Sequence, residues 1–143
     1  MLATASHFAM IRSLGKAPGA QEIEAIARQT LARLPAPFAD QLGNLSLAVE
    51  DFADDALLDD LGIASAYELT GVYEGIPLTE QSIDHSGTMP ERVRLFRLPI
   101  LLEWCERGDV SLEDLVAHVV IHEIGHHFGL SDADMHALEE QVS

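Results

Sequence analysis

The stretch HEIGHHFGLSD, residues 122–132, decides the fold that this sequence predicts. It contains His122, Glu123 and His126 in the spacing H-E-x-x-H. On a helix, residues four apart lie one turn apart on the same face, so both imidazoles can reach one metal ion. Glu123 directly follows the first histidine and can address water at the metal without binding the ion itself. The stretch therefore predicts a helix that carries a metal site.

Asp132 is the predicted third ligand. It lies six residues after His126, beyond Gly129, which can end the helix and turn the chain back. Imidazole nitrogens and a carboxylate oxygen suit zinc, and three protein ligands leave the fourth position open, as in catalytic zinc sites. Three rival third ligands, which lack this spacing from the glycine, follow in the last segment: Asp134, His136 and Glu139.

The predicted ligands and Glu123 indicate hydrolytic chemistry. Zinc lowers the pKa of a bound water towards about 7. Glu123 would take a proton from that water and return it to the leaving amine, which makes it the predicted catalytic base. Hydrolysis of a peptide or amide bond is the reaction that this set of residues favours.

Four neighbouring residues have weaker interpretations. His127 is rotated by about 100° around the helix from His126, so we expect it to pack or to form a hydrogen bond. His118 lies about 12 Å along the helix axis from His126, so we expect it to line a cleft wall and not to share the ion. Met135 is expected either to lie beneath the metal site, as the methionine of a metzincin turn does, or to make an apolar contact. Tyr73 could donate to an oxyanion, although packing in a strand is favoured.

Hydrophobic periodicity predicts helices around a small sheet, within one domain over residues 20–143. Helices are predicted at 21–34, 99–107, 112–128 and 134–141, and strands at 45–50, 69–73 and 92–97. Residues 48–62 are expected to form an acidic turn and then a short helix that ends at Gly62, and Ser111 is expected to cap the helix 112–128. Apolar residues on nearly every side of the helix 112–128 indicate that it is central and buried. The strand 92–97 is expected to form the sheet edge beside it, where an extended substrate could dock.

Three other segments are not part of this pattern. Residues 1–19 are expected to be a loosely ordered leader, and residues 76–90 a long polar loop of a kind that is often functional. The acidic residues at 50–55 lack the glycine-bearing loop pattern of calcium sites. We therefore expect them to form a solvated turn.

Composition restricts the environment and the partners. The chain is 48% hydrophobic and 22% charged, as in soluble globular proteins, and its net charge is -16. Such a surface repels phosphate backbones and anionic lipids, so neither nucleic acid nor a membrane is an expected partner. The single cysteine, Cys105, excludes an intrachain disulfide. With no signal-peptide pattern and no long apolar segment, a cytoplasmic protein is expected.

The chain resembles the small bacterial minimal zincins, a family of possible zinc metallopeptidases with a metzincin-like HExxHxxGxxD motif. Besides HEIGHHFGLSD, the resemblance rests on VEDFADD at 49–55, LTGVYEGIPLTE at 69–80 and MPERVRLFRLPI at 89–100. It implies an α+β fold, a compact zincin core in which a small mixed sheet packs on the central motif helix. It also implies zinc on His122, His126 and Asp132, with Glu123 as base. Family members have a basic residue after PLTE, where this chain has Gln81.

Three functions compete at this point. The first is a zinc-dependent metallopeptidase that acts on peptides or unstructured protein segments. The second is a metal-stabilised binding module with little or no catalysis, although a purely structural site has no need of Glu123. The third is a metal-dependent ribonuclease, against which the acidic surface and Glu123 both argue.

Overall fold

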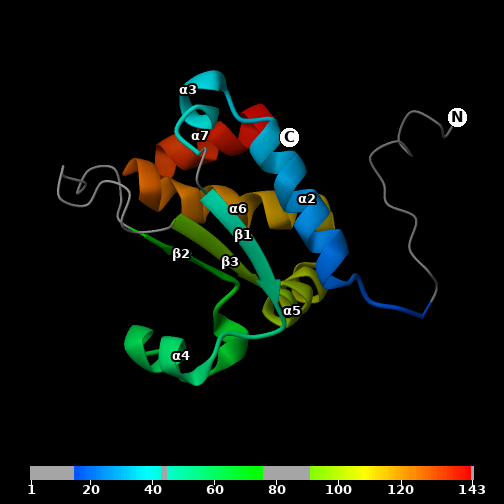
Figure 1. Cartoon of the computed structure of the whole chain (residues 1–143). Coiled ribbons are helices and arrows are strands. Elements are labelled where there is room, and N and C mark those ends of the chain that lie inside the picture. Colours follow the sequence, from blue (N-terminus) through cyan, green and yellow to red (C-terminus); the bar gives the residue numbers. More distant parts are fainter. Residues whose placement is uncertain (1–14, 43–44, 76–90, 143) are drawn as a thin grey trace, which may run out of the picture.

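The computed structural model describes residues 15–42, 45–75 and 91–142. Its elements, shown in Figure 1, are α2 (Ala20–Ala32), α3 (Ala36–Ala39), β1 (Leu45–Glu50), α4 (Asp55–Leu61), the 3-10 turn η1 (Ala66–Glu68), β2 (Gly71–Glu74), β3 (Glu91–Phe96), α5 (Arg97–Arg107), α6 (Leu112–Phe128) and α7 (Asp132–Val142). The predicted α+β class is confirmed. Residues 1–14 of the predicted leader and the whole predicted loop 76–90 lie outside the described residues.

The sheet has the strand order β1-β3-β2. β3 runs parallel to β1 and antiparallel to β2, with Tyr73 opposite Val93. The prediction that residues 92–97 form the edge is therefore wrong, because β3 is the central strand. Its residues from Val93 to Phe96 are all buried, and a strand covered on both faces is best placed between two neighbours. In the described part of the sheet, β2 is the outer strand beside β3.

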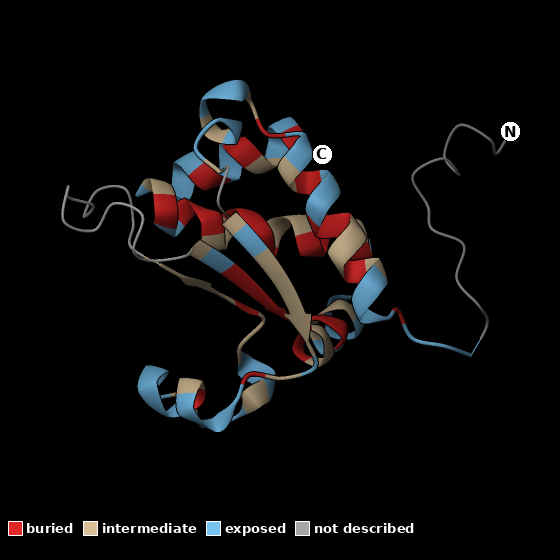
Figure 2. Ribbon diagram, in the orientation of Figure 1, coloured by how far each residue is buried: buried red, intermediate tan, exposed pale blue. Residues whose placement is uncertain are grey.

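The helix α6 lies against one face of the sheet, between α2 and α7 (Figure 1). Its buried residues occupy almost every side: Leu112, Leu115, Val116, Val119, Val120, Ile121, Ile124, Gly125 and His127. Figure 2 shows this buried helix behind the buried strand β3. The prediction of a central, buried helix is confirmed. Even α6, with 17 residues, is not suited to cross a membrane, and neither is any other helix in the described ranges.

Both ends of α6 are fixed by the residues that the sequence indicates. The Ser111 hydroxyl accepts a hydrogen bond from the backbone N–H of Asp114 at 3.0 Å, which caps the first turn. Gly129 takes a left-handed conformation, with φ of 67°, and the N–H of Leu130 donates to the carbonyl of Gly125 at 3.0 Å. This closing turn delivers the chain directly into α7.

Two of the acidic residues at 50–55, Glu50 and Asp54, bind a buried arginine. The Arg94 guanidinium binds Glu50 at 2.8 Å and Asp54 at 3.0 Å, and Glu74 on β2 approaches it at 3.1 Å. Only 10% of the Arg94 side chain is exposed. Asp54 is 57% exposed, as expected of a solvated turn. Glu50 departs from that expectation, because it is the last residue of β1 and compensates the buried cation on β3.

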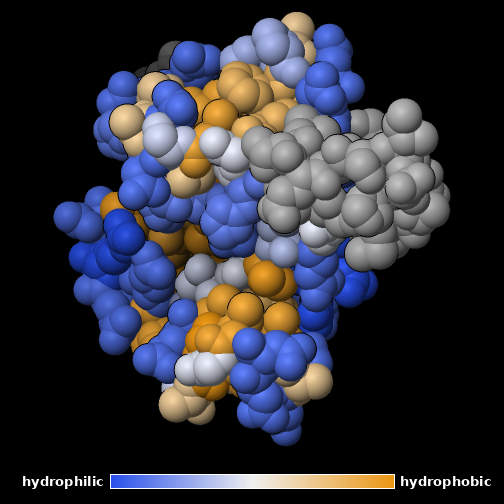
Figure 3. Space-filling view, turned by 90° about the vertical axis from the view of Figure 1, so that its left-hand side faces the viewer, coloured by the Kyte–Doolittle hydropathy of each residue, from blue (hydrophilic) through white to orange (hydrophobic). Residues whose placement is uncertain are grey.

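A smaller apolar cluster joins α4 to the sheet through Ala53, Leu58 and Phe96. Two apolar side chains of the same elements, Leu61 on α4 and Tyr67 on η1, are exposed. Figure 3 shows apolar side chains gathered at the bottom of the molecule, at the level of α4. This cluster anchors α4 and η1 to the face of β3 opposite α6.

The helices α6 and α7 are in close contact at Gly125. A Cβ atom there would overlap the Sδ atom of Met135 and lie 2.9 Å from its Cγ atom. Met135 is buried in the main core, so the expectation of an apolar contact is confirmed. Because Gly125 lies between His122 and His126 in sequence, this contact sets the distance of α7 from the motif.

Replacing Gly125 by Ala tests this approach. Helix propensity favours alanine by about 0.5–1 kcal/mol, whereas overpacking a core costs about 1–3 kcal/mol. We therefore expect Gly125→Ala to lower the free energy of unfolding by about 1 kcal/mol in urea denaturation. In a Met135→Ala background the added methyl group has room, so Gly125→Ala should raise the free energy of unfolding. An equal effect in both backgrounds would show that this contact does not limit the packing.

Candidate metal centre

Three of the four predicted site residues lie on α6, and the fourth begins α7. His122 and Glu123 are partly buried, whereas His126 and Asp132 are exposed. His126 and Asp132 both lie near enough to His122 for their charges to act on its pKa. The tight turn at Gly129 is what returns Asp132 towards the histidines.

His122 is suited to metal binding by its surroundings. Burial lowers the pKa of its imidazole, and the neighbouring His118 lowers it further. Glu139 and Asp132 act in the opposite direction, with smaller effects. A metal ligand must be a neutral imidazole with a free lone pair, and burial favours that form.

Glu123 is held between α6 and β2. Its side chain is only 16% exposed, and its Oε1 atom accepts a hydrogen bond from the backbone N–H of Tyr73 at 2.9 Å. The same oxygen lies 3.8 Å from Nδ1 of His126. Burial raises the pKa of Glu123 to about 7, against the opposing effect of the Tyr73 hydrogen bond. The predicted base is therefore a carboxylate that titrates near neutral pH.

The close approach of β2 to α6 makes this hydrogen bond possible. A Cβ atom on Gly71, the first residue of β2, would lie 2.8 Å from Cγ1 of Val119 on α6. Glycine at this position therefore lets the strand lie directly against the helix. Two residues later, the N–H of Tyr73 reaches Glu123. The sequence pattern did not reveal this contact.

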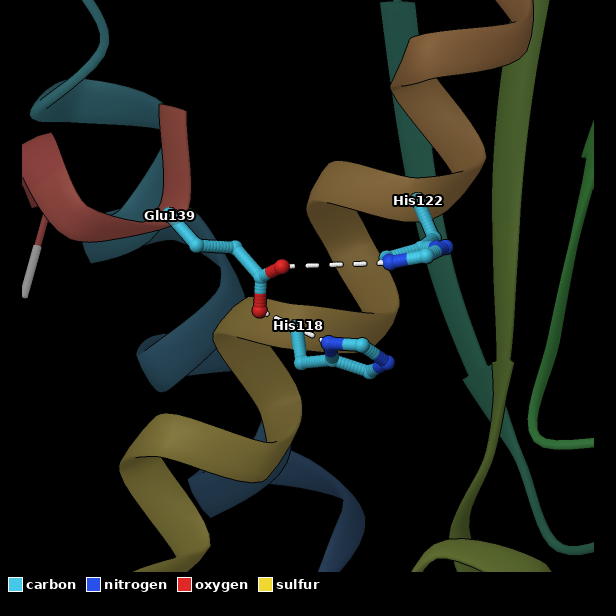
Figure 4. Close-up of side chains that lie close together, drawn as sticks. All are labelled: His118, His122 and Glu139. Carbon is cyan, nitrogen blue, oxygen red and sulfur yellow. Dashed lines mark hydrogen bonds and ion pairs between the residues drawn. The ribbon is translucent and has the colours of Figure 1, made fainter. Parts of the chain in front are cut away.

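A second group of ligands lies beside His122. Glu139 on α7 places Oε1 at 2.7 Å from Nδ1 of His118 and Oε2 at 3.8 Å from Nε2 of His122 (Figure 4). In the described residues, these three side chains form a group whose potential ligand atoms all lie within 4.8 Å of one another. His126 and Asp132 do not join such a group there. The ligand set of His122, His126 and Asp132 stays a prediction.

The other two rival ligands have different roles. The Ser131 hydroxyl accepts a hydrogen bond from the N–H of Asp134 at 3.1 Å, so Asp134 belongs to the N-terminal cap of α7. His136 lies 3.4 Å from Glu140, and both side chains are more than 70% exposed. Of the three rivals, Glu139 is thus the one that contacts His122.

His127 packs inside the protein, as predicted. Its Nδ1 atom lies 3.0 Å from the Tyr73 hydroxyl and 3.3 Å from Oε1 of Glu91. Its Nε2 atom is buried and has no hydrogen-bond partner in the described part of the chain. Burial and the charge of Glu91 raise the pKa of Tyr73 to about 12, so its hydroxyl stays protonated at neutral pH. Backbone and side chain of Tyr73 therefore both attach β2 to α6.

Comparison with known proteins gives one family match. The sequence model of the family described as "Zincin-like metallopeptidase" matches residues 42–142. This range includes the sheet, α6, α7 and all the site residues described above. No curated protein matches the chain.

The raised pKa of Glu123 predicts how stability depends on pH in the metal-free protein. Its pKa rises from an ordinary 4.5 to about 7 on folding. Between these values the folded state binds more protons than the unfolded state, so the free energy of unfolding falls as pH rises. The total loss is about 3 kcal/mol and is complete about one pH unit above 7, where the folded-state carboxyl is fully ionised.

Glu123→Gln is the matched variant, because its amide oxygen can still accept the Tyr73 N–H but cannot ionise. Urea denaturation of the chelator-treated proteins between pH 4.5 and 8 should show a steeper decline for the wild type than for Glu123→Gln. Parallel profiles over that range would contradict a buried carboxylate at this position.

Proposed function

This chain belongs to the zincin-like metallopeptidase family, and on that premise we propose that it is a zinc-dependent peptidase. The observation that carries the proposal is the environment of Glu123. A partly buried carboxylate with a pKa of about 7 directly follows a partly buried histidine on the same helix. General bases work best when their pKa lies near the operating pH.

The donors around α6 fit zinc. His122, His126 and Asp132 would hold the ion through two imidazole nitrogens and a carboxylate oxygen, as in catalytic zinc sites with three protein ligands. The lowered pKa of His122 supports the neutral form that ligation needs. A zinc ion bound there supplies Lewis-acid polarisation of water and of a substrate carbonyl.

Glu123 transfers the proton. The N–H of Tyr73 occupies Oε1, which fixes the orientation of the carboxylate and leaves Oε2 to accept a proton from water. The protonated carboxyl then passes that proton to the leaving amine. Burial, which raises the pKa of the Glu123 carboxyl, favours both halves of this transfer, because the group must gain and lose a proton within one cycle.

The substrate is an extended peptide or an unstructured protein segment. Because β3 is central, the docking role expected for residues 92–97 passes to β2, the outer strand next to Glu123. Extended peptides add to outer strands through backbone hydrogen bonds. The net charge of -16 favours peptides that carry lysine or arginine.

A metal-stabilised binding module is the second candidate. The group of His118, His122 and Glu139 favours it, because these side chains gather without including Glu123. A module of this kind would bind metal yet leave peptides intact.

Exchange of Glu123 separates the two candidates. We expect Glu123→Gln to retain bound zinc, measured by elemental analysis, and to lose peptidase activity by about 100-fold or more on a peptide library. Glu140→Gln, which changes an exposed carboxylate on α7, is the control and should keep both properties. Zinc-loaded wild type that cleaves no peptide in the library would favour the binding module.

A further inference from the structure

We propose that His118, His122 and Glu139 form a second position for a divalent transition metal, and that this position shares His122 with the predicted zinc site. A neutral imidazole has one nitrogen with a free lone pair. His122 therefore binds one ion at a time, so the two positions are alternatives. An ion beside Glu139 keeps His122 from the predicted catalytic position.

The three side chains already lie close to coordination geometry. Zinc bonds of about 2.1 Å in a tetrahedron place ligand atoms about 3.4 Å apart. Here the potential ligand atoms lie within 4.8 Å of one another, and the two imidazole rings are 4.2 Å apart between centroids. In Figure 4 the Glu139 carboxylate faces both rings, with one oxygen directed at each. To bind one ion, these atoms need to move from separations of up to 4.8 Å to about 3.4 Å.

The packing of α7 on α6 fixes where these ligands lie. Met135 contacts Gly125, and Glu139, one turn later on α7, meets His122 and His118, which precede Gly125 on α6. The two helices therefore run antiparallel at this contact. Leu138, which precedes Glu139 in sequence, and Val142, which follows it, are both buried in the core. The backbone positions of all three ligands are thus set by the core of the protein.

The group differs from an ordinary surface ion pair. His136 and Glu140 form such a pair on α7, with side chains that are 75% and 72% exposed. Glu139 is only 20% exposed and faces two histidines from a neighbouring helix. Two imidazoles and a carboxylate are a donor set that zinc and cobalt bind well.

The sequence around His118 indicates that this position binds metal without hydrolysis. His118 and His122 have the same four-residue spacing as the H-E-x-x-H pair, but Val119 occupies the place of the base. Glu123 is directed instead at the N–H of Tyr73 on β2. An ion bound by His118, His122 and Glu139 therefore has no carboxylate base at position 119, the position that corresponds to Glu123 in the motif.

Cobalt binding to the full chain tests this position apart from activity. The double variant His126→Ala/Asp132→Asn lacks two of the predicted catalytic ligands, and we expect it still to bind one Co²⁺, seen in the visible absorption spectrum. Adding His118→Ala should weaken that binding by more than about 100-fold, since loss of a merely supporting partner already costs about 10–100-fold. Adding His136→Ala instead, which removes an exposed histidine of α7, should leave the affinity unchanged.

Two results would overturn the proposal. One is a double variant that binds Co²⁺ no more tightly than the variant that also lacks His118. The other is a wild-type protein that takes up two equivalents of tightly bound Co²⁺, which would exclude a shared His122. Denaturation curves for each variant establish that it is folded. These results do not depend on peptide cleavage, so failure here is distinct from failure of the proposed peptidase activity.

Discussion

The helix α6 must be covered on almost every side, and the arrangement of the other elements follows from that constraint. Its apolar residues are too numerous for one contact face, so the sheet packs on one side while α2 and α7 cover others. The polar side chains of α6 therefore contact the strand and the helix that pack against it. Glu123 meets a backbone N–H of β2, His127 meets the side chain of Tyr73, and His122 meets Glu139 of α7. The site is thus built from the contacts that bury the helix.

Much of this could be predicted from local sequence. The apolar periodicity of α6, its serine cap and its terminal glycine are properties of a short continuous stretch, and the structure confirms all three. The mixed α+β class also follows from local patterns. Because a helix rotates successive residues by about 100°, His127 was expected to pack or to form a hydrogen bond, and it does both.

What could not be predicted depends on contacts between distant segments. Residues 92–97 were expected at the sheet edge, but β3 is the central strand. Arg94 on β3 binds carboxylates from β1, β2 and the turn after β1, which are distant from it in sequence. The contact of Glu139 with the histidines depends on the register of α7 against α6, which the spacing from Gly129 does not contain. A hint was present, since Glu139 lies one turn after the apolar Met135. The Tyr73 amide leaves no side-chain signal at all.

His122 is the residue on which both metal positions depend, and Glu123 follows it directly in the chain. The most direct measurement is anomalous diffraction at the zinc absorption edge from crystals of the zinc-loaded wild-type protein. We predict an anomalous peak within bonding distance of a ring nitrogen of His122. A peak held only by other side chains, or no peak in crystals grown with zinc, would contradict a metal centre on this helix.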